Sequence, residues 1–357
     1  APGAERMSGA APLDAAAGFW RAAAALARAP EEATRIGETP ADIALRLGKT
    51  ALARYRPVAP PAPGPALLIV HGRVGRASVA DLAPDRSLAR DLLARGADVW
   101  TIDWGRPSRA DRHRDFADHV TGDLAACAGH VAAETGRPPA LLGICEGGVF
   151  ALCLAALEPA AVSGLALAIT PIDFHADPDA LLTRWIRAIP PGELERLVDA
   201  FGYLPGGLMG AIFQAMTPGR AMEAYTTGLL DLAEDEAALR GFLRMERWLK
   251  DRPHHPGAAA KELLIGLYHE NRLVRGRFAL DGRRVDPGAV RAPVLVALGL
   301  RDHIVPPACA RALAPRLSPG VSYEELALDA GHIGVFVSRR VSGRLSASLG
   351  DWLARLA

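Results

Sequence analysis

The sequence is poor in cysteine, in aromatic residues and in net charge. Only four cysteines occur in 357 residues, aromatic side chains make up 6% of the chain, and the formal net charge is +1. The cysteines form no C-x-x-C pair and show no zinc-ligand spacing with histidine, which predicts reduced thiols, a cytoplasmic address and no bound metal. A net charge near zero provides no strong field for nucleic acid or an anionic membrane surface.

Long hydrophobic runs and a secretory leader are also missing. The uncharged runs at residues 147–157 and 159–172 are shorter than the roughly 20 residues of a membrane span. No signal peptide with a clear cleavage pattern is visible. Half of the residues are nevertheless hydrophobic, so the chain can form one large α/β domain with an insertion, or two domains.

The order of the predicted elements divides the chain into three parts. Residues 1–57 are expected to be an N-terminal helical segment, with two or three helices within 13–56, one of them starting at Thr39 and Pro40. A proline-rich linker follows. Short buried strands are then expected at 66–70, 98–102, 139–142, 165–169, 293–298 and 323–328, with helices between the early ones at 86–95, 116–134 and 149–157. Alternating strands and helices predict a parallel sheet that is covered on both faces.

The most informative motif is Gly143–Gly148 (G-I-C-E-G-G), which lies between a predicted strand and a predicted helix. A strand, a Gly-x-nucleophile-x-Gly turn and a helix make up the nucleophile elbow of α/β-hydrolase folds. Glycines permit the sharp turn, and the residue between them points toward substrate. Cys145 occupies this position in place of the usual serine, and a thiol is a natural acceptor in thioester exchange.

The fold class that follows is α/β. We expect an α/β-hydrolase fold with a mostly parallel sheet and an inserted, mainly helical cap. The core would consist of residues 58–170 and 289–357. Residues 171–288 would form the cap insertion, because they show helical segments and no clear buried strand before 278–280.

A cysteine nucleophile needs a base, and the base needs an acid that orients it. In this fold the acid follows a late strand, and the histidine lies in a loop near the C-terminus. Asp302 follows the strand expected at 293–298, and His332 lies in a glycine-containing loop after the last strand. Cys145, Asp302 and His332 are therefore predicted to be the catalytic residues.

Other residues compete for these roles. His303 adjoins the acid and is an alternative base, although we expect it to support the triad from beside it. Asp103 and Asp329 are alternative carboxylates, and Asp103 is expected to be a structural turn residue. For the oxyanion hole, this fold uses the backbone N–H after the nucleophile, here Glu146, and one from the loop after an early strand. That loop is 71–76, in which the backbone N–H of Val74 is our candidate.

These residues resemble the catalytic subunits of polyhydroxyalkanoate synthases, most like the short, two-subunit (class III) type. The resemblance runs from about residue 37 to the C-terminus. The blocks that carry it are Asp81–Leu88, Thr101–Pro107, Gly143–Gly148, Thr170–Phe174, Met245–Trp248, Asp302–Pro306 and Gly331–Gly334.

The resemblance implies a polymerising acyltransferase that uses a 3-hydroxyacyl-CoA thioester as its substrate and no cofactor. It implies Cys145 as the acylated nucleophile, His332 as the base and Asp302 as the acid. A second, non-catalytic synthase subunit, a homodimer and association with polymer granules in the cytoplasm are likewise implied. The family usually has Gln after the cysteine, whereas this chain has Glu146, and a carboxylate facing the sulfur would disfavour the thiolate.

Two alternatives remain open at this point. A cysteine-dependent thioesterase or depolymerase would pass the acyl group to water. A non-catalytic polymer-granule coat protein would adsorb through the apolar stretch Phe201–Met216, which is otherwise a cap helix or a dimer contact. A transferase needs a covered pocket, so we expect the cap to lie over Cys145 and part of 171–235 to move, with Pro190-Pro191 and Gly206-Gly207 as candidate hinges.

Overall fold

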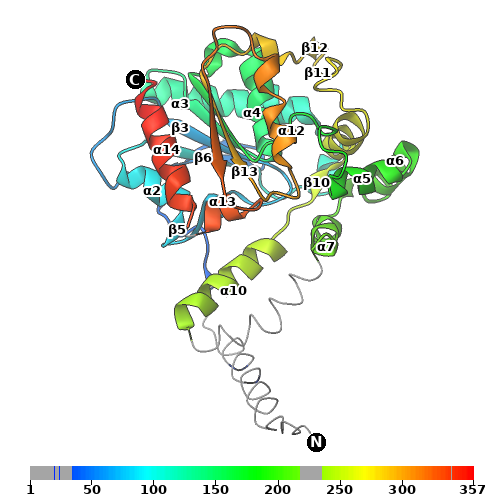
Figure 1. Cartoon of the computed structure of the whole chain (residues 1–357), viewed down its shortest axis with the longest axis horizontal. Helices are drawn as coiled ribbons and strands as arrows, with labels where there is room; N and C mark the ends of the chain where they lie inside the picture. Colours follow the sequence, from blue (N-terminus) through cyan, green and yellow to red (C-terminus); the bar gives the residue numbers. More distant parts are fainter. Residues whose placement is uncertain (1–19, 21–23, 25–33, 218–234, 339) are drawn as a thin grey trace, which may run out of the picture.

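The centre of the molecule is an eight-stranded sheet. The computed structural model describes residues 20, 24, 34–217, 235–338 and 340–357. The strand order is β1-β2-β6-β3-β7-β8-β13-β14 (Figure 1). The bounds are β1 (Ala41–Leu47), β2 (Thr50–Tyr55), β3 (Leu67–His71), β6 (Val99–Asp103), β7 (Ala140–Ile144), β8 (Gly164–Ala168), β13 (Val294–Gly299) and β14 (Tyr323–Leu328).

The strands from β6 to β14 are all parallel, and only β1 and β2 run antiparallel to their neighbours. The central strands β3, β7, β8 and β13 are buried along their whole length. This burial is typical of parallel strands with helices on both faces, and it explains why they read as continuous apolar runs. The expected mostly parallel α/β sheet is confirmed.

Helices cover both faces of the sheet, and each face has its own core. Successive side chains of a strand point to opposite faces, so Leu141 of β7 belongs to one hydrophobic cluster and Leu142 to the other. The first cluster contains α3 (Ala125–Thr135), α4 (Glu146–Leu157) and α12 (Pro307–Arg311). The second contains residues of α2 (Leu88–Ala94), α13 (Gly334–Val337) and α14 (Ser342–Ala354).

The expectation of helices up to residue 56 is wrong for the described part of that segment. Residues 41–55 form the antiparallel hairpin β1–β2, which extends the sheet beyond β6. Thr39 does not cap a helix, because its N–H and its hydroxyl donate to the carboxylate of Asp81 at 2.9 and 2.7 Å. Leu52 is fully buried against the sheet, so tertiary packing outweighs the local helix-start signal. Most of 13–33 lies outside the described residues.

The chain between β8 and β13 is mainly helical. Its described α-helices and strands are α5 (Leu181–Ala188), α6 (Pro191–Phe201), β9 (Tyr203–Leu204), α7 (Gly206–Ala215), α10 (Glu236–Lys250), β10 (His255–Pro256), α11 (Gly257–Lys261), β11 (Ala279–Leu280) and β12 (Arg283–Arg284), and a π-helix, η6 (Glu262–His269), follows α11. Figure 1 shows α5, α6, α7 and α10 outside the sheet layers. As a division into domains, the boundaries at 57, 170 and 288 remain a prediction.

The helices between β8 and β13 have a core of their own. Leu182 of α5, Val198 of α6 and Met209 of α7 are buried in one cluster with Leu264. No helix in the described part of the chain combines the length and the apolar character that crossing a membrane requires. This third cluster keeps the helical segment together on the same side of the molecule as the end of β7, where Cys145 lies.

Candidate active site

Cys145 lies at the turn between β7 and α4, at the N-cap position of the helix. Its backbone has φ 54° and ψ −122°, a conformation that is strained for a residue with a side chain. The turn is tight because Gly143 and Gly148 touch: a Cβ on Gly143 would lie 2.3 Å from the Gly148 Cα. The Cys145 N–H donates to Ala168 O of β8 at 2.9 Å, which fixes the turn to the sheet.

His332 and Asp302 meet above this turn. The Nδ1–H of His332 donates to Asp302 Oδ2 at 2.7 Å, and both side chains are almost fully buried. Asp302 Oδ1 accepts the backbone N–H groups of Ile304 and Val305, each at 2.9 Å, so the carboxylate is held after β13. Burial opposes the charged imidazole, but the Asp302 carboxylate and the Cys145 side chain raise the pKa of His332 to about 10.

The alternative acids have other partners. Asp103 forms an ion pair with Arg76 at 3.1 Å and accepts the Gly105 N–H, which makes it a turn residue after β6. Asp329 pairs with Arg301 at 2.8 Å and with Arg340 at 2.7 Å on the surface. Of these three carboxylates, Asp302 is therefore the one that is hydrogen-bonded to His332. His303 is exposed and lines the cavity next to the pair.

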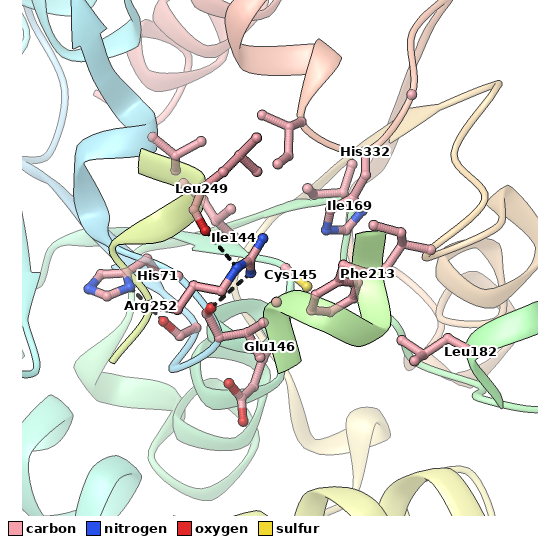
Figure 2. A pocket seen from close by; sticks show the side chains of 18 of the residues that line it. His71, Ile144, Cys145, Glu146, Ile169, Leu182, Phe213, Leu249, Arg252 and His332 are labelled. Carbon is pink, nitrogen blue, oxygen red and sulfur yellow. Dashed lines mark hydrogen bonds between the residues drawn. The ribbon is translucent and has the colours of Figure 1, made fainter. Parts of the chain in front are cut away.

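Cys145 opens into a cavity of about 440 Å³. Its walls come from the loops at the ends of β3, β7, β8, β13 and β14 and from the helices between β8 and β13. Figure 2 shows Cys145 and His332 beside Phe213 of α7, with Leu182 of α5 and Leu249 of α10 in the surrounding wall. The expected placement of Cys145 in a pocket that residues of 171–288 help to line is therefore observed.

The two backbone donors expected for the oxyanion hole line this same cavity. Glu146 is the first residue of α4, where a helix leaves its N–H groups without intrahelical partners. Val74 lies in the loop 71–76, which follows β3. Across the described residues, neither of these two N–H groups donates a hydrogen bond to a protein acceptor. Their role as the donors of an oxyanion hole stays a prediction.

The side chain of Glu146 points away from Cys145 (Figure 2). Its Oε2 accepts the Arg73 N–H and its Oε1 accepts the Nε2–H of His255, both at 2.7 Å. Burial alone would raise the pKa of Glu146, but His255 and Arg73 lower it, so the carboxylate stays ionised. The Glu146 carboxylate is bound by Arg73 and His255 behind the elbow. The glutamate that this chain has in place of the family's usual glutamine therefore does not put a negative charge against the Cys145 sulfur.

Two residues of the site have no signal in the sequence. Arg252 lines the cavity and donates from Nε to Leu249 O at 2.9 Å and from Nη1 to Val74 O at 3.3 Å. His255 is fully buried at the rear of the elbow. Both follow α10, and the only local clue is a charged, proline-containing stretch at 250–256. Nothing in that stretch indicates contact with loop 71–76.

The other three cysteines are buried and unpaired. Burial raises the pKa of Cys127 to about 12 and that of Cys309 to about 11, and it raises the pKa of Cys153 as well. Thiols of this kind behave as small apolar side chains. Among the described residues, no group of three or more His, Cys, Asp or Glu side chains has a metal-binding arrangement.

Comparison with known proteins identifies the fold and the family. Residues 65–338 match the family model for the alpha/beta hydrolase fold. A thermophilic esterase from Thermogutta terrifontis superimposes with a TM-score of 0.50 over 88% of this chain and 97% of that chain, at 18% sequence identity. At that identity the similarity supports the fold alone.

The sequence relatives are more specific. The poly(3-hydroxyalkanoate) polymerase subunit PhaC of Allochromatium vinosum is 36% identical over 325 residues, which cover 90% of each chain. The protein of the same name from a Synechocystis species is 34% identical over 91% of this chain and 86% of its own length. The order of the blocks, the elbow cysteine and these relatives agree, and the chain belongs to the poly(3-hydroxyalkanoate) polymerase PhaC family.

Proposed function

We propose that this chain polymerises 3-hydroxyacyl-CoA thioesters and releases coenzyme A through an acyl-enzyme on Cys145. The observation that supports the proposal most strongly is the elbow cysteine in one cavity with a histidine that is hydrogen-bonded to a buried aspartate. The curated relatives are named as polymerase subunits, which supports transfer to a growing polymer over the other acyl-transfer reactions of this fold.

Acylation needs three events at the elbow. His332 accepts the thiol proton at Nε2, while Asp302 accepts the Nδ1–H and stabilises the resulting imidazolium. The raised pKa of His332 agrees with this, because the site favours the protonated ring. The Cys145 sulfur attacks the thioester carbonyl, and the oxyanion of the tetrahedral intermediate accepts the Glu146 and Val74 N–H groups. The C–S bond to coenzyme A then breaks, and His332 returns the proton to the departing thiolate.

Elongation uses the 3-hydroxyl of a bound acyl unit as the next nucleophile. Its oxygen attacks a second thioester carbonyl, and its proton passes to a base at the site. The C–S bond of that thioester breaks as the ester bond forms, and the departing coenzyme A thiolate takes up the proton. Asp302, directly or through His332, is the base that the site offers for this step. A cavity with walls of Phe213, Leu182 and Leu249 favours a hydroxyl acyl acceptor over bulk water.

The substrate and binding partners that we propose for this chain are those implied by its family. The substrate is a coenzyme A thioester, and no further cofactor takes part. A second, non-catalytic synthase subunit, a second copy of this chain and the surface of a polymer granule are proposed partners. Met209 of α7 and Met216, which follows that helix, are buried in one hydrophobic cluster, which supports a cap helix for this part of the apolar stretch 201–216.

The experiment is incubation of the protein with 3-hydroxybutyryl-CoA, with and without a candidate partner subunit, while coenzyme A and polymer are measured together. Equal amounts of coenzyme A and polymerised units support the polymerase. Coenzyme A released with free 3-hydroxybutyrate identifies a thioesterase instead. No release by an intact, folded protein, with or without the partner, identifies a granule-coat protein. Cys145→Ala is the negative control, and Cys309→Ala is its matched cysteine control.

A further inference from the structure

The carboxylate of Glu146 joins three segments behind the active site. Glu146 is 2% exposed and His255 is 0% exposed, so the pair is sealed from solvent. One oxygen holds the Arg73 N–H of loop 71–76, and the other holds the imidazole of His255, which follows α10. Gly72 makes this approach possible, since a Cβ there would lie 2.8 Å from the Glu146 Cβ.

The segment 248–255 holds the same loop from its other side. The Trp248 Nε1–H donates to Arg76 O at 3.2 Å, and Arg252 Nη1 donates to Val74 O at 3.3 Å. The Trp248 ring lies against Gly75, where a Cβ would meet it at 3.0 Å. Loop 71–76 is therefore enclosed between the start of α4 and the end of α10.

These contacts bracket one group, the N–H of Val74. The N–H one residue earlier is fixed by Glu146, and the carbonyl of Val74 itself is fixed by Arg252. With a hydrogen bond on each side, the peptide that carries the Val74 N–H has little freedom to turn away from the cavity. Glu146 also supplies the second expected donor through its own backbone N–H.

We propose that Glu146 and His255 are positioning residues for the oxyanion hole, which is completed only when segment 248–255 is seated on loop 71–76. The inference rests on the proposed acylation of Cys145. Neither side chain contacts the substrate. Their role is to keep the Val74 N–H aimed at the oxygen that becomes negative in the transition state, so their loss should lower kcat and leave KM nearly unchanged.

The test uses variants that separate positioning from stability. Glu146→Ala and His255→Ala remove the link. Glu146→Gln retains the link, because its amide can accept from the Arg73 N–H and pair with a neutral His255 imidazole. His255→Gln retains it, because its amide can donate to the Glu146 carboxylate. We expect the alanine variants to lose about 10- to 100-fold in kcat, as for misplaced oxyanion donors, and the glutamine variants to recover most of it.

A second variant keeps the test decisive if the alanine variants do not fold. The double variant Glu146→Leu/His255→Leu replaces the buried polar pair with apolar side chains, an exchange that proteins often tolerate or gain stability from. It should melt near the wild-type temperature and still lose kcat, because the Arg73 N–H has no acceptor. His254→Ala is the matched control: His254 stacks on Tyr203 at 4.0 Å and accepts the Gly206 N–H, away from loop 71–76.

Single-turnover labelling of Cys145 by radioactive 3-hydroxybutyryl-CoA provides the rate. If the wild type acylates Cys145 and the folded double-leucine variant does so equally fast, the positioning role is refuted while the cysteine mechanism stands. If the wild type turns over without acylating Cys145, the mechanism itself is wrong. A loss confined to melting temperature in the alanine variants would also overturn the inference.

Discussion

The Nδ1 atom of His332 lies 2.7 Å from Oδ2 of Asp302, while the other oxygen of the same carboxylate accepts two backbone N–H groups. The aspartate thus cannot rotate without losing three hydrogen bonds at once. Such a carboxylate fixes both the tautomer and the direction of the imidazole ring. The Cys145 side chain, which shares the cavity with the imidazole, also helps to raise the pKa of His332.

The first prediction concerns pH and stability. The folded-state pKa of His332 is about 10, above its ordinary value of 6.5. The stability from this group is therefore fully present below pH 6.5 and is lost as the pH rises through 10. Asp302→Asn removes the main favourable charge, so the variant should lose less stability over this window, by a difference on the order of 1–3 kcal/mol. Urea unfolding of both proteins at pH 6.5 and 9.5 measures it, and parallel curves would contradict the assignment.

The second prediction concerns the base. His332→Gln should slow acylation of Cys145 by about 10²- to 10⁴-fold, because the thiol loses its proton acceptor. Single-turnover labelling measures this step in isolation from elongation. Substitution of the exposed neighbour His303→Gln provides the comparison, since His303 lines the same cavity. Equal acylation rates for the wild type and His332→Gln would show that His332 is not the base.

The third prediction separates acylation from elongation. Asp302→Asn should spare acylation more than chain growth, if the carboxylate also serves the 3-hydroxyl of the bound acyl unit. Rapid quenching would show labelled Cys145 that accumulates without a matching increase in polymer. A variant in which both steps slow by the same factor would instead limit Asp302 to orienting His332.

The fourth prediction concerns thiol reactivity. In the native protein, iodoacetamide should modify Cys145 and spare the other three thiols, because burial raises the pKa values of Cys127, Cys153 and Cys309. Peptide mass mapping identifies the labelled residue. Cys145→Ala should lose both the label and coenzyme A release, whereas Cys127→Ala should keep both. Labelling of a buried cysteine at the same rate would show that the native core opens.

The fifth prediction concerns the packing of the elbow. A Cβ on Gly148 would lie 1.9 Å from Thr170 Oγ1, so Gly148→Ala should destabilise the protein by roughly 1–3 kcal/mol. Gly129 is a matched control, because it lies in α3 with nothing within 4 Å of its added Cβ. Gly129→Ala should be neutral or stabilising by about 0.5–1 kcal/mol. Thermal melts that rank the two variants in the opposite order would refute the packing argument.

Movement of the cap stays a prediction. The described helices α5 and α7 line the cavity, and the segment 218–234 of the expected mobile region lies outside the described residues. We expect slower amide exchange in 181–216 when Cys145→Ala is saturated with 3-hydroxybutyryl-CoA. The buried strand β3 is the internal reference. Unchanged exchange would favour a fixed entrance.

The elbow could be predicted from the sequence because its signals are local. A strand, two glycines around a nucleophile and a helix occur within twenty residues, and their geometry depends on little else. The contact between Asp302 and His332 can be anticipated because each residue lies in the loop that follows a strand of the same parallel pair, while their catalytic roles stay predictions. The hairpin at 41–55 could not be predicted in this way, because Thr39, which precedes it, interacts with Asp81, 42 residues away in the sequence. The Glu146–His255 contact spans 109 residues, and no local pattern marks either partner for the other.

The turn at Cys145 is held by neighbours that never touch its sulfur. Its positive φ is maintained by Gly143 against Gly148, by the first turn of α4 and by the bond from its own N–H to β8. The backbone would accept oxygen in the place of sulfur without rearrangement. The identity of the nucleophilic atom can therefore change while the backbone of the turn that presents it stays the same.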